Sequence, residues 1–88
     1  MVRAGNLNNA INEYNKIEKK IGVVEDVILQ KELIYVNMNK IDKAVEELNK
    51  LIDSDPEEVR YYGMLAELYQ ANGFNDKAMA TYKKLLQL

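Results

Sequence analysis

Carboxylates are the side chains of this sequence that could most readily do chemistry, because acidic residues stand in three adjacent pairs. Two carboxylates that face each other across a cleft can act as general acid and base, and a cluster of them can bind a hard cation such as calcium. Neighbours in sequence point to different sides of a helix, so these pairs are expected on solvated faces or at helix starts. The pairs are Glu25 with Asp26, Glu46 with Glu47, and Glu57 with Glu58.

The rest of the reactive inventory is very small. The sequence has no His and no Cys, and its only hydroxyl side chains besides the tyrosines are Ser54 and Thr81. The usual pairings of a nucleophile with a base therefore cannot be assembled. The four glycines stand singly, so there is no glycine-rich phosphate loop. This inventory predicts that the protein is not an enzyme and has no catalytic residue, no cofactor and no metal site.

The charge balance argues against nucleic acid as a partner. Twelve Lys and Arg are scattered among fourteen Asp and Glu, which gives a net charge of −2 and no basic stripe that would neutralise phosphates. The apolar runs are only a few residues long, far short of a membrane span. With 48% hydrophobic and 30% charged residues, the sequence describes a small soluble globular protein and leaves its cellular location open.

A phrase of six residues returns twice at a spacing of 34. Residues 5–10 read GNLNNA, residues 39–44 read NKIDKA and residues 73–78 read GFNDKA. Such self-similarity at a fixed period is typical of a stacked array. Three rows of similar residues lie four and three positions apart, which on a helix makes one apolar stripe that begins with a small residue and lets a second helix approach closely. The rows are Ala10, Ala44 and Ala78; Tyr14, Leu48 and Tyr82; and Ile17, Leu51 and Leu85.

Each phrase is interpreted as a turn between two helices. Its first residue falls where a chain leaving a helix usually becomes left-handed, a conformation that glycine takes freely and asparagine tolerates. Its fourth residue is an Asn or Asp, which can accept hydrogen bonds from the amides that open the next helix. In the third turn the apolar residue shifts by one place, from the row of Ile41 to Phe74, so a different geometry is possible at that corner. The left-handed positions are Gly5, Asn39 and Gly73, and the capping positions are Asn8, Asp42 and Asp76.

The periodicity predicts five helices and no strand, because the apolar residues recur at three and four positions and not at two. The fourth helix has the clearest start. Asp55 is placed to cap it, Pro56 suits its first position, and the two glutamates that follow favour the positive end of the helix dipole. The predicted helices are residues 7–21, 25–38, 42–53, 56–71 and 75–87.

The repeat resembles the tetratricopeptide repeat, a family whose unit is a helix-turn-helix of about 34 residues. The copy that begins at Val59 matches the family's signature best, and Pro56 fits the family's closing proline. The resemblance covers the whole chain and implies an all-α fold, a right-handed superhelical solenoid of antiparallel helix pairs. Residues 1–24 are then the second half of one repeat, 25–58 a full repeat and 59–88 a nearly full one. The signature positions are Tyr62, Leu65, Ala66, Tyr69, Gly73, Ala78, Tyr82 and Leu85.

The second copy departs from the family pattern at Lys31 and Glu32, where family members usually carry an aliphatic residue followed by a small one. Ile28 and Tyr35 keep their places on either side. In the plainest interpretation, Lys31 runs its methylene groups along the edge of the core and sends its ammonium outward or to a nearby carboxylate. Two alternatives remain, a buried charge kept for partner recognition and a helix that is locally rotated.

The resemblance implies that the first helices of the repeats line the concave side of the array, where an extended peptide or a partner helix commonly lies. Leu29, Leu33 and Val36 are spaced four and three apart on a face separate from the core stripe, so this helix has a second apolar contact to make. The expected function is that of a non-catalytic scaffold for a protein or peptide partner, with a hydrophobic segment or an amphipathic helix fitting best. The expected partner-binding residues are Asp26, Leu29, Gln30, Leu33, Val36, Arg60, Met64 and Glu67.

A structural alternative is a spacer or self-association module within a larger repeat protein. Counting backward from the first turn, Met1 to Ala4 are expected to form the last turn of a helix whose earlier part is missing. The apolar face of the next helix then lacks a neighbour, and no polar capping helix follows the last one. Self-association through these two open ends is therefore expected. The residues concerned are Ile11, Ile17 and Ile21 at one end and Leu85, Leu86 and Leu88 at the other.

Lysines gather on the second helices of the repeats, whose outward face is convex in the resembled family. Such charges usually keep a surface solvated, and docking of an acidic partner is the alternative. These lysines are Lys16, Lys19, Lys20, Lys43, Lys50, Lys77, Lys83 and Lys84.

Overall fold

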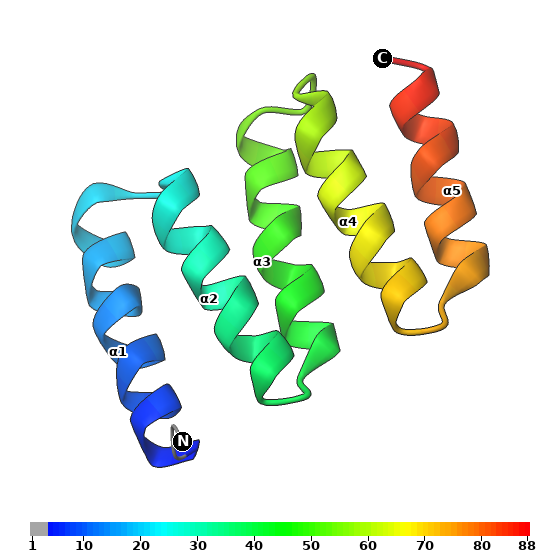
Figure 1. Ribbon diagram of the computed structural model, residues 1–88. Coiled ribbons are helices and arrows are strands. Elements are labelled where there is room, and N and C mark those ends of the chain that lie inside the picture. The colour runs from blue at the N-terminus through cyan, green and yellow to red at the C-terminus, as the bar shows by residue number, and fades with distance from the viewer. Residues whose placement is uncertain (1–3) are drawn as a thin grey trace.

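The computed structural model describes residues 4–88, which form five helices and no strand (Figure 1). The predicted all-α fold is therefore confirmed. Three of the helices, α2, α3 and α5, begin and end within one residue of the predicted ranges. The helices are α1 (Ala4–Ile21), α2 (Glu25–Asn37), α3 (Ile41–Ser54), α4 (Val59–Ala71) and α5 (Asn75–Leu86).

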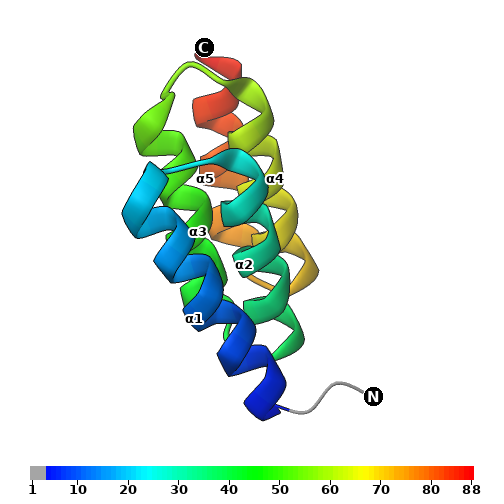
Figure 2. The same cartoon turned by 90° about the vertical axis from the view of Figure 1, so that its left-hand side faces the viewer.

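The helices form two layers, with α2 and α4 in one and α1, α3 and α5 in the other (Figure 2). Successive helices run in opposite directions along the array (Figure 1). Packing is most extensive within the pairs α2–α3 and α4–α5, and less so between α3 and α4 and between α1 and α2. The chain is thus an array of antiparallel helix pairs in which each helix packs against its neighbours in sequence.

The core lies where α2, α3 and α4 meet. The repeated small residue of the apolar stripe is almost completely covered at Ala44 and Ala78, whereas Ala10 in the first copy is half-buried. A small side chain at that position lets the two helices of a pair approach closely. The prediction that this row faces a neighbouring helix is confirmed. The cluster of buried core residues is Ile28, Ala44, Leu48, Leu51, Tyr61, Leu65 and Leu68.

Burial falls off toward the two ends of the array. Leu51 is 1% exposed, whereas Ile17, one repeat earlier on the same row, is 40% exposed. The difference follows from neighbours, because the backbone of α3 lies close to both α2 and α4 while that of α1 lies close to α2 alone. Equivalent sequence positions therefore contribute unequally to stability.

Two of the residues expected at the open ends are less exposed than predicted. Ile11 is buried, because it lies on the side of α1 that is covered by the rest of the chain. Leu85 is half-buried, because it lies beside Gly63 of α4, where the absence of a side chain leaves room for it. Ile17, Ile21, Leu86 and Leu88 are exposed as expected.

The two turns that join the helices of a pair have the same geometry. Asn39 and Gly73 are left-handed, with φ of 58° and 81°, as predicted. In each case the next residue donates its backbone N–H back across the turn, Lys40 to the oxygen of Tyr35 at 2.8 Å and Phe74 to the oxygen of Tyr69 at 2.9 Å. These are the bonds of a glycine-type helix ending. The shifted apolar residue does not alter the corner, because Phe74 occupies the place of Lys40 in the bonding pattern.

The first copy of the phrase does not form a turn. Gly5 and Asn8 lie inside α1, which begins at Ala4 and continues through the phrase, so the predicted start at residue 7 is wrong. Glycine permits a left-handed turn without requiring one, and Gly5 is not left-handed. Ala4 was expected to close an earlier helix and is instead the first residue of α1, while the rest of that expectation, for residues 1–3, lies outside the described residues.

The predicted helix caps are also displaced. The residues at the capping positions of α3 and α5 are Lys40 and Phe74, and neither side chain caps its helix. Asp42 and Asp76 lie two residues further on, in the first turn, where their charge favours the positive end of the helix dipole without accepting the first amides. The acidic residue in the phrase therefore acts through charge and not as a cap.

Helix α4 begins at Val59, three residues later than predicted. Asp55 ends α3, where its N–H bonds to the oxygen of Leu51 at 3.0 Å, so it cannot also open the next helix. Pro56 instead lies in a turn closed by the N–H of Glu58 and the oxygen of Asp55 at 3.1 Å. The cap is Glu58, whose side chain accepts a hydrogen bond from the backbone N–H of Arg60 at 3.2 Å.

The gradient of burial along the array can be tested by truncating one row of the repeat. Leu51→Ala is expected to lower the free energy of unfolding by about 2–4 kcal/mol, because it opens a cavity in the core. Ile17→Ala is expected to cost less than about 1 kcal/mol, because Ile17 is already partly in water and alanine favours the helix. Urea unfolding followed by circular dichroism measures both changes. Equal losses would contradict the gradient.

Candidate functional site

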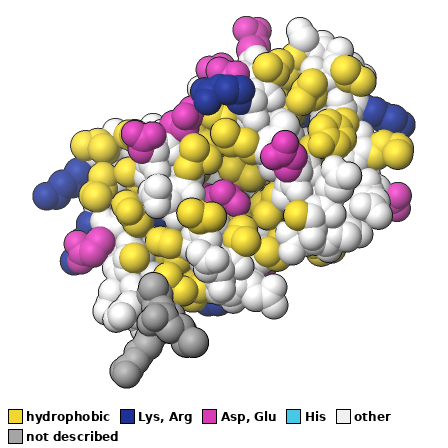
Figure 3. All heavy atoms as spheres, in the orientation of Figure 1, with side chains coloured by type: hydrophobic (Ala, Val, Ile, Leu, Met, Phe, Trp, Pro, Cys, Tyr) yellow, Lys and Arg dark blue, Asp and Glu magenta, His cyan; other side chains and the backbone are white. Residues whose placement is uncertain are grey.

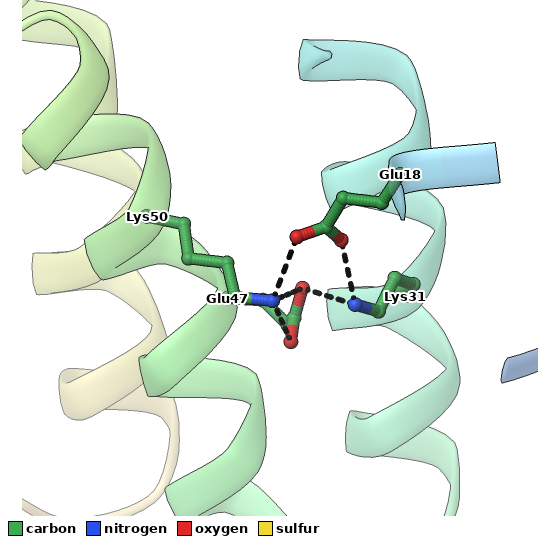
Figure 4. A network of polar contacts seen from close by, with 4 residues as sticks. All are labelled: Glu18, Lys31, Glu47 and Lys50. Atoms are coloured by element: carbon green, nitrogen blue, oxygen red, sulfur yellow. Dashed lines mark hydrogen bonds and ion pairs between the residues drawn. The ribbon is translucent and has the colours of Figure 1, made fainter. Parts of the chain in front are cut away.

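Among the described residues, the most buried charge is that of Lys31 on α2, which is 1% exposed. Its Nζ lies 2.9 Å from Oε1 of Glu18 on α1 and 3.0 Å from Oε1 of Glu47 on α3 (Figure 4). Two carboxylates from two different helices thus surround one ammonium. A buried charge of this kind is tolerated only when it is closely paired and hydrogen-bonded.

Lys50 on α3 completes the cluster. Its Nζ lies 3.0 Å from Oε2 of Glu18 and 3.3 Å from Oε2 of Glu47 (Figure 4). Burial acts to raise the pKa of Glu18, but the bonds from Lys31 and Lys50 outweigh it and hold that pKa below its ordinary value. Burial likewise acts to lower the pKa of Lys50, and its acidic partners hold it above the ordinary value. We call Glu18, Lys31, Glu47 and Lys50 the ion cluster.

The ion cluster decides between the interpretations of Lys31. The expected contact with a nearby carboxylate is confirmed, whereas the expected outward path of the ammonium is wrong because α1 and α3 both supply carboxylates at the core. Helix α2 is not rotated, since Ile28 remains fully buried one turn before Lys31. The charge is used within the chain, where it joins α1 to the first helix pair.

Replacing Lys31 tests the balance of charges in the ion cluster. Lys31→Met is expected to lower the free energy of unfolding by about 2–4 kcal/mol, because two carboxylates then share the single cation Lys50 near the core. Chemical denaturation at neutral pH measures the loss. An increase in stability would show that the pairing does not compensate for the burial of Lys31.

A double variant provides the matched control. Lys31→Met with Glu47→Met removes one charge of each sign and leaves Glu18 paired with Lys50. Apolar side chains of similar size often replace a buried ion pair at no cost. The double variant is therefore expected to recover most of the stability lost in Lys31→Met. A double variant that loses the sum of two single losses would contradict this account.

A second polar contact joins the beginnings of α2 and α4. Oε1 of Glu25 accepts hydrogen bonds from the hydroxyl of Tyr61 at 2.7 Å and from Nη2 of Arg60 at 2.9 Å. The bond from Tyr61, followed by that from Arg60, lowers the pKa of Glu25, and the same bond raises the pKa of Tyr61. Arg60 also pairs with Glu58 at 3.5 Å. The guanidinium is therefore engaged inside the chain.

A groove of about 300 Å³ lies between α2 and α4. Four of the residues predicted to bind a partner meet there, namely Leu33, Val36, Met64 and Glu67. Figure 3 views the molecule from the α2–α4 side and shows hydrophobic side chains gathered on this face with carboxylates between them. Leu33 is 53% exposed, while Val36 and Met64 are half-buried and reach the core cluster. We call this hollow the α2–α4 groove. Its lining is Glu32, Leu33, Val36, Leu48, Met64, Glu67, Leu68, Ala71 and Asn72.

The other four predicted residues do not line the α2–α4 groove. Asp26 and Gln30 are exposed on α2 outside it. Leu29 packs partly against the core cluster, so its apolar surface is largely used. Arg60 forms ion pairs with Glu25 and Glu58 at the start of α4. Three of the four apolar predicted residues thus line the α2–α4 groove, whereas Glu67 is the one polar member of the set that does.

Glu32 lines the α2–α4 groove and was not among the predicted residues. It is half-buried, and the burial raises the pKa of its carboxyl above the ordinary value. The signal for this role was present in the sequence, because Glu32 lies four residues before Val36 and replaces a small residue of the family pattern. The sequence shows that this residue departs from the family pattern, but its place in the groove depends on the position of α4.

Two of the glutamates with shifted pKa values, Glu18 and Glu32, predict opposite pH dependence of stability. Folding lowers the pKa of Glu18, so its ionised form stabilises the fold above its unfolded pKa, and this contribution is lost as the pH falls through its folded pKa. Folding raises the pKa of Glu32, so its ionised form destabilises the fold above its folded pKa, and the penalty is relieved as the pH falls. The other carboxylate that lines the α2–α4 groove with Glu32 is that of Glu67 on α4.

Glu18→Gln is therefore expected to be destabilising at about pH 7, with a loss that shrinks below about pH 4. Glu32→Gln is expected to stabilise the fold at about pH 7 by a few tenths to about 1 kcal/mol, allowing for the water that still reaches the carboxylate. Its gain should shrink as the pH approaches about 4. Urea titrations across this pH range give both profiles, and parallel profiles would contradict the assignment.

A larger hollow of about 380 Å³ lies on the opposite layer, between α3 and α5. Its floor includes Tyr62 and Tyr69 of α4, and its wall on α5 includes Lys77 and Lys84. Nζ of Lys77 lies 5.8 Å from the centre of the Tyr69 ring, a distance at which a cation interacts with an aromatic face. Two of the lysines expected to solvate the outer surface thus line this hollow. None of the predicted partner-binding residues does.

The arrangement of the described residues offers little for metal or membrane chemistry. Within residues 4–88, no three acidic side chains come together as a potential metal site. None of the helices in that range has the length and apolarity needed to cross a membrane. The α2–α4 groove instead presents apolar side chains at helical spacing with carboxylates among them, which suits contact with another polypeptide.

Comparison with known proteins identifies the same repeat. The sequence model of the tetratricopeptide repeat matches residues 33–58 and 59–88, which together make up more than half of the chain. The second match begins at the first residue of α4. A search of curated protein sequences found no match.

Two solved structures of MamA are similar to this chain. One is 28% identical with a TM-score of 0.76 and aligns with 93% of this chain and 45% of its own. The other is also 28% identical, with a TM-score of 0.74, and aligns with 92% of this chain and 47% of its own. The chain therefore spans less than half of the length of either MamA structure. The similarity supports the array of helix pairs across α1 to α5.

Proposed function

Since this chain belongs to the tetratricopeptide repeat family, we propose that it is a non-catalytic scaffold that binds a peptide or a partner helix along its α2–α4 face. Repeats of this family generally mediate contacts between proteins, and the chain's lack of His and Cys agrees with a role that needs no reactive side chain. The proposed partner is a protein segment and neither a nucleic acid nor a membrane. The scattered lysines and the net charge of −2 support that choice.

The observation that carries the proposal is the apolar lining of the α2–α4 groove. Leu33 leaves about half of its surface in water, beside Val36 and Met64 in a hollow that a side chain of a partner would fill. Helix α2 thus has an apolar contact left to make after its core stripe is buried. We assign partner contact first to Leu33, Val36, Met64 and Glu67, and then to Asp26, Leu29, Gln30 and Arg60 at the edge of the same face.

The division into repeats is part of the same proposal. We assign residues 1–24 to the second half of one repeat, 25–58 to a full repeat and 59–88 to a nearly full one. In this division α2 and α4 are the first helices of their repeats, and α1, α3 and α5 are second helices. The two layers of Figure 2 separate the helices in the same way.

A second candidate function is a spacer or self-association module. The exposed apolar side chains on the outermost helices favour it, because Ile21 of α1 and Met79 of α5 are each 62% exposed. Burying even about 300 Å² of such surface is worth about 7 kcal/mol before the costs of association. Contact between copies through α1 and α5 would leave the α2–α4 face open, so the two functions are compatible.

Point variants on the two surfaces separate these functions. Leu33→Asp and Met64→Asp are each expected to weaken binding of a selected peptide at least tenfold, because a charge in the groove opposes apolar contact. Leu33→Asp should leave the fold intact, since Leu33 is half exposed. Fluorescence anisotropy with a peptide selected against this chain measures binding, and circular dichroism measures the fold.

Met79→Asp is the matched control on α5. It places the same charge at an exposed apolar position outside the α2–α4 groove. Binding should be unchanged in this variant, whereas light scattering should show less self-association. If Leu33→Asp changes only the oligomeric state and Met79→Asp abolishes binding, the assignment of the two surfaces is wrong.

A further inference from the structure

The α2–α4 groove contains two carboxylates and no cation. Glu32 lies half-buried on α2, and Glu67 lies exposed on α4. Within residues 4–88, neither forms an ion pair with another side chain. None of the lining residues is a Lys or an Arg. The groove therefore has negative charge beside its apolar side chains without an internal counterion.

The cations of the two helices that form the groove are already engaged elsewhere. Helices α2 and α4 contain only Lys31 and Arg60 as basic residues. Lys31 points into the ion cluster, where it bonds to Glu18 and Glu47. Arg60 bonds to Glu25 at the far end of the face. Neither is available to Glu32 without breaking a close pair.

This arrangement restricts what can fill the groove. A partner that covered Glu32 with apolar atoms alone would remove the water that still solvates its carboxylate and would give nothing in return. A partner that places an ammonium or a guanidinium beside the carboxylate returns a charge-assisted hydrogen bond. A partner with a carboxylate at that place would be repelled by both glutamates.

We propose that the occupant of the α2–α4 groove is a segment of another protein that carries a Lys or Arg next to its apolar anchors, with the cation bound between Glu32 and Glu67 and the anchors on Leu33, Val36 and Met64. This inference rests on the proposed function and adds the charge of the partner to it. The carboxylates fix the position of the segment along the groove, and the apolar lining supplies most of the buried surface.

A selection from a peptide library tests the inference on the whole chain. The probe is a display library of short helical peptides that keep Leu at positions i, i+3 and i+7 and carry Lys, Gln or Glu at random elsewhere. Peptides selected on the wild-type chain are expected to be enriched in Lys and depleted in Glu. Their binding should weaken as salt is added, because part of the contact is between opposite charges.

Variants of the two carboxylates then locate the charge contact. Glu32→Gln is expected to weaken the most enriched peptide about tenfold, and Glu67→Gln several-fold because it is more exposed. The matched control is Glu46→Gln, which removes an exposed carboxylate of α3 outside the groove and should leave the affinity unchanged. Glu32→Gln keeps the shape of the side chain and removes a half-buried charge, so the fold is expected to persist.

The outcomes distinguish this inference from the function on which it rests. Equal enrichment of Lys and Gln, or an unchanged affinity in Glu32→Gln, overturns the basic partner. If Leu33→Asp still abolishes binding in that case, the groove remains a docking site for an uncharged segment. If no peptide is enriched, or if Leu33→Asp binds as well as the wild type, both the groove and its basic partner are overturned.

Discussion

The helices of this chain bury their apolar stripes mainly against the helices next to them in sequence. This constraint determines which side chains are buried and which are left exposed. Helix α3 has neighbours on both sides and holds Ala44, Leu48 and Leu51 almost free of water. Helix α1 has close backbone packing with α2 only, touches α3 through one side-chain ion pair, and leaves Ile17 and Ile21 exposed. Such an array leaves hollows on both of its layers, one between α2 and α4 and one between α3 and α5, as well as exposed apolar side chains on its outermost helices.

The ion cluster shows how charge is accommodated within the same constraint. Lys31 stands where members of the family usually carry an aliphatic side chain. Its charge and those of Glu18, Glu47 and Lys50 add to a net charge of zero. Because these charges come from α1, α2 and α3, they join the helix that packs least to the best-packed part of the chain. Glu32, the next residue, forms no ion pair within residues 4–88. Its carboxylate faces the groove and receives no cation from residues 4–88, and burial raises its pKa.

The sequence was sufficient to predict the elements of the fold but not the pairing of its charges. Period and turn chemistry are local, so the helices and the left-handed Asn39 and Gly73 were predicted correctly. The errors arose at residues that fit two kinds of local structure. Gly5 was predicted to lie in a turn and lies within a helix, and Pro56 was predicted to begin a helix and lies in a turn. The partners of Lys31 lie 13 residues before it and 16 after it, a relation that depends on how three helices pack. Only half of the predicted binding residues line one groove. The reason is related, because the position of α4 relative to α2 decides which of these residues meet.

The sparse packing of α1 has a consequence for the dynamics of the protein. A helix with so little packing opens at lower free energy than the rest of the array, as a unit that amide hydrogen exchange would record separately. When α1 opens, Glu18 leaves and water reaches Lys31, which then shares Glu47 with Lys50. The detachment of one helix thus turns a partly buried, neutral contact into a hydrated cationic surface on α2 and α3.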